Sequence, residues 1–474
     1  MISGDAGVLL RRKKKTMKLK YTLAAGALAL ATATQAQSWT PDTISTGVGY
    51  IDDGFYNLSS GQVKQEAAGN WDIAFITGQA FSAAVMVNHY GGSTGASGTQ
   101  RGNKLYDLNL DAATKWGTDL TADTAGKVTP ALALENQPLS WEEGAFNQNV
   151  SGPMNFGWGD YDVSTHWTTG NKVYLLLNKN GAYQIWIEQY QASLTAANRL
   201  WKFHIAKLDG TESASYDFHP AAEGYTNKLF AYFDVATRQF VNREPDMDNW
   251  HLLATRYPDA YHDTSSTWMS TTGILTNINV KVAARANAIP DNATQGDALS
   301  ATYSDYKNVI GGKYKVVNVN GTPPGWEVYD SLSYFVKIID GTDSGDIWQV
   351  YFDYFPAGTS GDVKIGLQKR KIYDYTEPPV TAVNEVNTVW SNVLLAPNPA
   401  VGGTTNLLID TKEDIKDAQI VITDLSGRAL NKFTTHIKQG FVRIPLNTSQ
   451  YPAGIYMVNL SGAGFSTTQK LVVK

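Results

Sequence analysis

A pattern of strands and turns that occurs twice between residues 37 and 375 limits the fold of this chain more than any other feature of its sequence. Phe55–Phe75 and Tyr232–Leu253 both contain an aromatic pair, a turn, a strand with a glutamine before a hydrophobic residue, and an Asn-Trp dipeptide at the start of a further strand. Each copy is much longer than the roughly 20–50 residues of a solenoid repeat. The sequence therefore predicts two tandem domains of one kind, at residues 37–222 and 223–375.

Both copies end in the same succession of strands. The dipeptide Gly-Trp, at residues 157–158 and 325–326, precedes a hairpin in each copy, and a further strand follows the hairpin. Glycine and asparagine in the turns supply the positive φ that hairpins require. The predicted hairpins are Lys172–Tyr190 and Tyr334–Phe355, and the predicted strands after them are Leu200–Lys207 and Val363–Lys371. We expect an all-β protein in which tryptophans at matching places of the two copies pack in the core.

The composition excludes several classes of protein. The chain has no cysteine, which excludes a disulfide scaffold, a thiolate nucleophile, cysteine-bound zinc and an iron–sulfur cluster. A net charge of −5 provides no basic field for nucleic acid. The G-x-S-x-G string at residues 91–95 is followed by a Gly/Ser-rich loop, whereas a nucleophile elbow needs a helix there. We therefore expect no enzymatic activity, since a hydrolase would need an acid pair or a triad that converges in a cleft.

Residues 1–36 have the pattern of a secretory signal peptide. A basic segment precedes the apolar stretch Tyr21–Ala33, and the small residues after it suit cleavage behind Ala36. Met17 is the predicted initiator, and a longer basic region that begins at Met1 is the alternative. No other stretch approaches the length of a membrane-spanning helix. The sequence therefore predicts an exported protein without a transmembrane segment.

The C-terminal part has its own strand pattern. Residues 376–392 are mostly polar and contain prolines, which predicts a linker, and the short strands after them predict a small Ig-like β-sandwich. Four motifs, Pro397-Asn398-Pro399, DLSGRAL, AGIYMV and the terminal QKLVVK, resemble the type A C-terminal sorting domain of the type IX secretion system of Bacteroidota. The resemblance covers residues 393–474. It implies a partner in the secretion machinery, removal of this domain, and release of the remainder or its attachment to the outer-membrane surface. An ordinary Ig-like accessory module is the alternative.

The duplicated part resembles the HmuY family of haem-binding proteins of Bacteroidota. The resemblance rests on the strand WDIAF at Trp71–Phe75, the Asn-Gly-Gly turn signal that begins at Asn88, the segment GWGDY and the hairpin KVYLLLNKNGAYQIWIEQY. The second copy has WHLLA in place of WDIAF and matches less well. The resemblance implies two HmuY-like antiparallel β modules, each with a ligand cleft at one rim. It also implies haem as the cofactor, iron acquisition as the function and an outer-membrane haem receptor as a partner.

The resemblance also suggests which residues would bind haem iron. In the family one ligand histidine lies just after the Gly-Trp motif and the other ligand lies in an insert before it. The nearest donors in this chain are His166, three or four positions beyond the family's place, and Met154. The alternative is that His166 is a hydrogen-bonded rim residue and that Met154 fills a gap in the packing. The corresponding loop is almost absent from the second copy, between Tyr329 and Tyr334, so we expect no haem there.

Other polar residues suggest weaker sites. His89 is expected to be exposed and inert, and His204 is expected to face away from its apolar strand neighbours. His262 is a candidate for a separate site, and three aspartates of one turn are candidate calcium ligands beside the simpler interpretation of a solvated turn. These aspartates are Asp340, Asp343 and Asp346. The sequence thus favours an exported, non-catalytic haem-binding protein, and the alternative is a surface adhesion or glycan-contact protein of the same fold.

Overall fold

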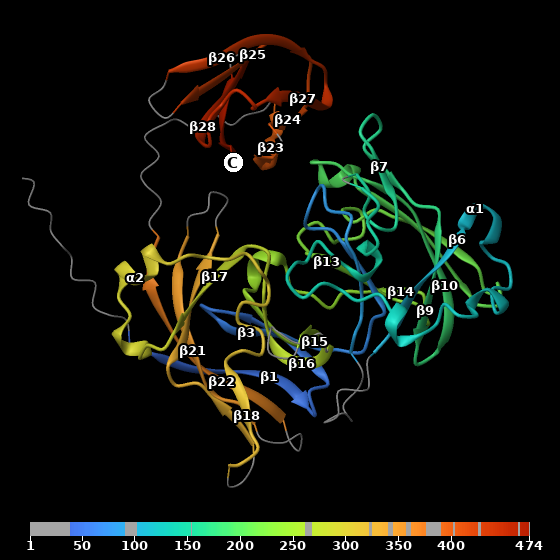
Figure 1. The fold of residues 1–474 in the computed structure, drawn as a ribbon, viewed down its shortest axis with the longest axis vertical. Helices are drawn as coiled ribbons and strands as arrows, with labels where there is room; N and C mark the ends of the chain where they lie inside the picture. Colours follow the sequence, from blue (N-terminus) through green and yellow to red (C-terminus); the bar gives the residue numbers. More distant parts are fainter. Residues whose placement is uncertain are drawn as a thin grey trace, which may run out of the picture. The chain divides into compact units, whose positions relative to one another are not determined.

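The computed structural model describes a mostly β protein (Figure 1). The described residues are 38–90, 102–152, 154–260, 268–321, 325–339, 345–356, 362–375, 390–401, 403–424, 428–462 and 465–473. The predicted signal peptide and most of the predicted linker lie outside these ranges. Two short α-helices, α1 (Ala112–Lys115) and α2 (Gln295–Ser300), occur between strands. Single 3₁₀ turns are Ala122–Thr124, Pro130–Leu132, Ala145–Asn147, Ala196–Asn198, Met247–Asn249 and Pro290–Asn292. None of the described helices is long and apolar enough to cross a membrane.

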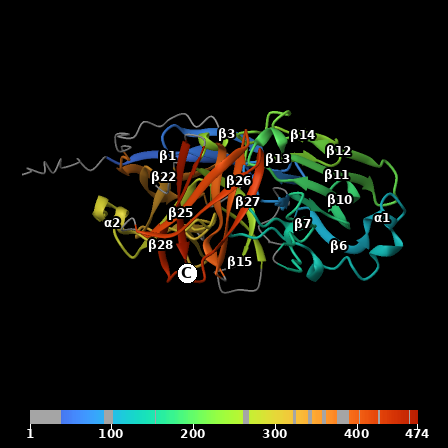
Figure 2. The same cartoon turned by 90° about the horizontal axis from the view of Figure 1, so that it is seen from above.

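Two large antiparallel sheets contain the predicted hairpins. The seven-stranded sheet consists of β6 (Lys104–Asp111), β7 (Asp160–Asp162), β8 (Trp167–Thr169), β9 (Lys172–Asn178), β10 (Gly181–Gln191), β11 (Leu200–Lys207) and β12 (Ala214–Phe218), of which Figure 2 labels β6, β7, β10, β11 and β12. The five-stranded sheet has the order β1 (Thr40–Val48), β22 (Asp362–Tyr373), β21 (Ile347–Tyr354), β20 (Leu332–Ile338) and β17 (Val280–Ala286). The pairs β9–β10 and β20–β21 confirm both predicted hairpins. A two-stranded ribbon of β18 (Lys315–Asn318) and β19 (Gly325–Val328) accompanies them.

Two four-stranded sheets combine strands from both sequence copies. One has the order β14 (Gln239–Val241), β13 (Phe230–Asp234), β4 (Ile73–Ile76) and β5 (Val85–Val87), and the other has the order β16 (Trp268–Thr276), β15 (Leu252–Ala260), β2 (Asp52–Asn57) and β3 (Gly61–Ala67). The first hairpin of each copy therefore pairs with the other copy. The strand β1 likewise joins the sheet of the second copy through β22. The predicted boundary between residues 222 and 223 thus separates strands that share sheets, because sequence similarity identifies equivalent hairpins but not their pairing partners.

The exchange of the first hairpins between the two copies is symmetrical, because equivalent residues form equivalent pairs. Alignment on Trp71 and Trp250 matches Ala74 with Leu253, and a gap of two residues before the tryptophan matches the aromatic pair Phe55-Tyr56 with Tyr232-Phe233. In the structure Tyr232 pairs with Ala74, and Phe55 pairs with Leu253. The pairing register is therefore the same in both sheets, so each hairpin pairs with the other copy in the same way.

The residue after each of these tryptophans accepts a backbone hydrogen bond from the turn of the exchanged hairpin. The Asp72 carboxylate accepts a hydrogen bond of 2.8 Å from the N–H of Val235, and His251 Nδ1 accepts one of 3.0 Å from the N–H of Leu58. Burial lowers the pKa of His251 to about 4, so its ring is neutral at pH 7 and can accept this bond. His251 therefore replaces the aspartate of WDIAF in its structural role, which explains the departure of the second copy from that motif.

The C-terminal residues form a separate core of seven strands. Their order is β26 (Ala429–Ile437), β25 (Ile415–Asp424), β28 (Gly454–Gly462), β29 (Phe465–Val473), β23 (Trp390–Val401), β24 (Thr404–Thr411) and β27 (Gly440–Asn447). Leu407, Ile420 and Leu460 are fully buried between them. Asn398 of the Pro-Asn-Pro motif donates to the carbonyl of Lys470 and accepts from the N–H of Val472, which ties this motif to the last strand.

Candidate functional site

The structure places His166 and Met154 around a common neighbour, Tyr161. The carbonyl of Met154 accepts a hydrogen bond of 2.8 Å from the N–H of Tyr161, and the Tyr161 hydroxyl lies 2.8 Å from His166 Nδ1. His166 has a φ of 62°, which is uncommon for a residue other than glycine. The Met154 side chain is 45% exposed. Both predicted donors therefore belong to one hairpin region, the strands β7 and β8 and the turn before them.

Most other candidate residues have structural partners. His204 lies 2.7 Å from Ser215 Oγ and 2.6 Å from Glu188 Oε2, and its ring stacks on Trp186. Asp346 forms an ion pair of 2.7 Å with Lys371. His262, Asp340 and Asp343 lie outside the described residues. Within the described ranges no group of three or more His, Cys, Asp or Glu residues is arranged to hold a metal ion.

The expectation that His89 is exposed is wrong. The residue is buried, its Nε2 accepts a hydrogen bond of 3.1 Å from the N–H of Asn136, and its Nδ1 lies 3.2 Å from a carboxylate oxygen of Glu135. Asn136 is itself fixed to β5, because its side chain both donates to and accepts from the backbone of Val87. The segment that contains Glu135 and Asn136 therefore lies against β5 and covers the imidazole of His89. The glycine-rich sequence after Tyr90 did not suggest this burial.

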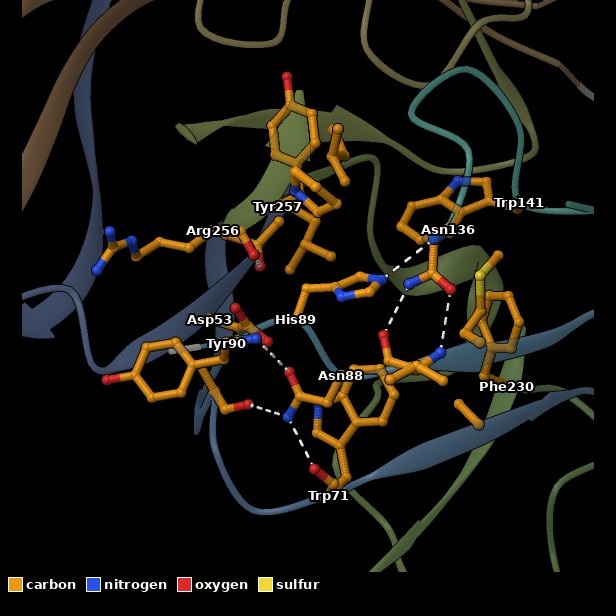
Figure 3. Close-up of a pocket in the computed structure, with 18 of the residues that line it drawn as sticks. Asp53, Trp71, Asn88, His89, Tyr90, Asn136, Trp141, Phe230, Arg256 and Tyr257 are labelled. Atoms are coloured by element: carbon orange, nitrogen blue, oxygen red, sulfur yellow. Dashed lines mark hydrogen bonds between the residues drawn. The ribbon is translucent and has the colours of Figure 1, made fainter. Parts of the chain in front are cut away.

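His89 lies in a cavity of about 80 Å³ where the exchanged hairpins meet (Figure 3). Five buried apolar side chains from β4, β5, β15 and β16 line it, and aromatic rings surround them. The apolar residues are Ala74, Met86, Val87, Leu253 and Leu275, and the aromatic residues are Trp71, Tyr90, Trp141, Phe230, Tyr232 and Tyr257. Both copies thus contribute to the wall, and the equivalent residues Ala74 and Leu253 are part of it.

A buried ion pair forms one side of this cavity. Arg243 donates to Asp53 over 2.7 Å, to Asn70 Oδ1 over 3.1 Å and to the carbonyl of Ala67 over 3.2 Å. Its guanidinium carbon lies 5.8 Å from the ring centre of Trp71. Arg243 and Asn70 come from the two segments that cross between the copies, so this arginine joins both crossings.

A buried lysine, Lys307, is another charged residue of the cavity wall. Lys307 is 4% exposed, its Nζ donates to the carbonyl of Ser140 over 2.6 Å, and it lies 4.4 Å from the ring centre of Trp141. Burial lowers the pKa of Lys307 to about 7. Trp71 Nε1 is also buried and has no hydrogen-bond partner among the described residues. No sequence motif indicates this set, because Trp71 and Lys307 are far apart in the sequence and come together only in the wall of the cavity.

A second cavity, of about 460 Å³, is lined by Met247, Trp250, His251 and Tyr375 among others. His251 is engaged there through its bond with Leu58. Neither His166 nor Met154 lines either of these two cavities.

Comparisons with known proteins identify the C-terminal domain. Residues 395–474 match the family model of the secretion system C-terminal sorting domain. This part is the sorting domain of a type IX secretion substrate, which implies interaction with that machinery and directs the protein to the cell surface or beyond it. No curated protein matches the chain.

Solved structures offer only distant likenesses. A structure described as an HmuY-like heme binding protein from Bacteroides vulgatus is 13% identical, covers 45% of this chain and 96% of its own, and has a TM-score of 0.16. Dimeric latent PorU from Porphyromonas gingivalis is 10% identical, covers 92% of this chain and 34% of its own, and also has a TM-score of 0.16. At these TM-scores neither likeness carries an argument about the fold or the ligand.

Proposed function

We propose that the duplicated part of this exported chain is a non-catalytic binding protein that holds haem through His166 and Met154 for iron acquisition. The observation that carries this proposal is that Tyr161 forms hydrogen bonds with both the His166 imidazole and the backbone of Met154. Histidine and methionine are both common axial ligands of haem iron. In the tautomer with its proton on Nδ1, His166 donates this hydrogen bond to the Tyr161 hydroxyl oxygen, which fixes the ring and leaves the Nε2 lone pair to bind iron.

The donor types fit haem, and the cavity volumes restrict where it could bind. The cavity beside His89 holds about 80 Å³, whereas benzene already occupies an engineered cavity of about 150 Å³. A porphyrin is several times larger than benzene, so this cavity cannot hold haem. The larger cavity of about 460 Å³ does not include His166 or Met154, so haem held by this pair would bind at the rim around Tyr161. When bound, haem would supply the iron that the protein carries to an outer-membrane receptor.

A visible-absorbance titration of residues 37–474 with haemin, oxidised and dithionite-reduced, tests the proposal. We expect a sharpened Soret band and resolved reduced α and β bands at one equivalent. His166→Ala should remove these bands and Met154→Leu should alter them, while the exposed His219→Ala serves as the matched control. Spectra of free haemin alone, or bands that persist in His166→Ala but vanish in Met247→Leu, would contradict this site.

An exposed aromatic group supports a second candidate function, glycan contact at the cell surface. The tryptophan of the Gly-Trp motif is 1% exposed at Trp158 but 39% exposed at Trp326, so the expectation that matching tryptophans pack in the core is wrong for Trp326. Tyr329 and Tyr354 are also exposed, at 44% and 55%. Binding to a glycan array that is lost in Trp326→Ala and kept in Tyr306→Ala, another exposed aromatic position, would support this function. Equal binding by both variants would contradict it.

A further inference from the structure

The wall of the cavity of about 460 Å³ combines apolar, aromatic and polar side chains. Its apolar and aromatic residues are Met247, Trp250, Ile338, Ile339 and Tyr375, and its polar residues are Asp248, His251, Asn279 and Asp346. The volume lies in the range of roughly 300–1,000 Å³ that is usual for pockets of small organic ligands. It is also roughly three times that of an engineered cavity of about 150 Å³ that holds benzene, so it has room for one or two six-membered rings.

His251 supplies a hydrogen-bond donor to this wall. The residue is 8% exposed, and its Nδ1 accepts a hydrogen bond of 3.0 Å from the N–H of Leu58. A neutral imidazole that accepts at Nδ1 carries its proton on Nε2. Among the described residues, the bond with Leu58 is the one hydrogen bond of this ring. Buried donors are nearly always hydrogen-bonded, so the Nε2–H indicates a ligand group with an oxygen acceptor.

Two carboxylates limit the charge of that group. Asp248 and Asp346 line the cavity, and Asp346 is paired with Lys371 over 2.7 Å. Neither lysine nor arginine is among the described residues that line the cavity. An anion would therefore be repelled by Asp248, and an ammonium group has no acceptor for the N–H of His251. Hydroxyl groups fit both neighbours, because they donate to a carboxylate and accept from an N–H, so the wall favours a neutral polyol.

We infer that this cavity binds a neutral mono- or disaccharide, whose hydroxyl groups bond His251 and Asp248 and whose apolar ring face contacts Trp250. Met247, Ile338 and the other apolar lining residues complete the contact with the ring carbons. Pockets of this kind use an apolar wall for affinity and a few polar groups for orientation.

This site is separate from both proposed functions. Neither His166 nor Met154 lines the cavity, and Trp326 of the exposed aromatic group does not line it either. It is also not a second haem site, because Nε2 of His251 carries the proton and has no lone pair for iron. The inference can therefore fail while either proposed function holds, and the reverse.

Isothermal titration calorimetry of residues 37–474 with a panel of neutral saccharides tests this inference. The panel consists of glucose, galactose, mannose, N-acetylglucosamine, lactose and cellobiose. Glucuronate and galacturonate are the controls for charge, and glycerol is the control for hydroxyl groups without a ring. We expect saturable binding of one saccharide per chain for at least one member, and weaker binding of the uronic acids. If no member bound more tightly than glycerol, the inference would be overturned.

His251→Asp is the variant that isolates the donor. It removes the Nε2–H but keeps an acceptor for Leu58, as Asp72 provides for Val235. We expect it to weaken saccharide binding about tenfold or more, because a buried hydrogen bond is lost. The exposed His219→Ala is the matched control and should bind as wild type. Wild-type affinity in His251→Asp would overturn the inference.

Asp248→Ala provides a second test if His251→Asp fails to fold. Asp248 is exposed, so its removal leaves the core intact, and we expect severalfold weaker binding. Asp217→Ala, at an exposed position outside the cavity, is its control. Trp326→Ala should leave the calorimetric affinity unchanged. Wild-type affinity in Asp248→Ala, or loss of binding in Trp326→Ala alone, would place the saccharide elsewhere and overturn the inference.

Discussion

Asp53 and Arg243 form a buried ion pair of 2.7 Å although 190 residues separate them in the sequence. Because the arginine also binds Asn70 and Ala67, the pair joins the two segments that cross between the sequence copies. Both residues are almost completely buried, since Arg243 is 1% exposed and Asp53 is 4% exposed.

We predict that Arg243→Met lowers the free energy of unfolding by about 3–5 kcal/mol, because it leaves the Asp53 carboxylate buried without its cation. The double variant Asp53→Asn/Arg243→Met should be more stable than Arg243→Met alone. Urea denaturation followed by tryptophan fluorescence measures both. Lys207→Met, in the exposed pair with Glu212, is the control and should change stability by about 1 kcal/mol or less. If Lys207→Met lowered the free energy of unfolding as much as Arg243→Met, the importance of the buried ion pair would be contradicted.

The exchanged hairpins predict which fragments fold. Residues 70–249 contain the whole seven-stranded sheet and the sheet of β4, β5, β13 and β14. We expect this fragment to be monomeric and to unfold cooperatively. Residues 37–222 follow the boundary expected from the sequence repeat, but they separate β4 from β13 and β2 from β15. This fragment should associate through unpaired strand edges, as measured by size-exclusion chromatography with light scattering. A monomeric 37–222 fragment with higher stability than 70–249 would contradict the observed pairing.

The stability of the protein should depend on His251 in acid. Its pKa is about 4 in the folded protein and has an ordinary value of 6.5, so between these pH values the unfolded chain binds more protons than the folded one. The contribution of His251 to stability is therefore complete above pH 6.5 and is lost as the pH falls toward 4. His251→Asp should retain an acceptor for Leu58 and weaken this dependence, whereas His251→Ala should cost about 1–3 kcal/mol at pH 7 because that N–H is left unsatisfied. Chemical denaturation at several pH values measures both effects, and His219→Ala should behave as wild type.

Two of the buried lysines predict that the free energy of unfolding changes at alkaline pH. The pKa values of Lys307 and Lys315 fall from 10.5 to about 7 on folding, so above pH 7 the unfolded chain holds more protons at these positions. The free energy of unfolding should therefore rise from pH 7 toward pH 10, by up to about 1.4 kcal/mol per pH unit for each lysine. Lys315→Met should reduce this rise. A slope that is unchanged in both Lys307→Met and Lys315→Met would contradict the buried positions.

Local sequence patterns predicted much of the secondary structure. The turn residues at Asn178–Gly181 and the alternation on both sides of them predicted β9 and β10, and Leu200–Lys207 agrees with β11. The sorting domain was also predictable, because its motifs include contacts that hold the domain together, such as those of Asn398. These features depend on residues that are close in the sequence or on a recurrent motif.

The pairing of the hairpins and the cavity could not be predicted in this way. The hairpins of the two copies have equivalent residues, so the pattern alone allows each to pair with either copy. The environments of His89 and Lys307 depend on that choice, since the buried wall includes strands of both copies. His251 shows the same limit, because its replacement of Asp72 looks like divergence until both are seen to accept equivalent backbone N–H groups.

The strand order also sets the order in which the chain can complete its fold. β1 and β2 are synthesised well before their partners β22 and β15, and Thr40 pairs with Lys369. Non-local pairing of this kind makes folding slow. The outer strand β3 has Lys64 and Glu66 at half-buried positions, and such charges discourage pairing with foreign strands. The sheets of the duplicated part stay incomplete until β22 has been synthesised, a property that suits a protein which must cross a membrane before it folds.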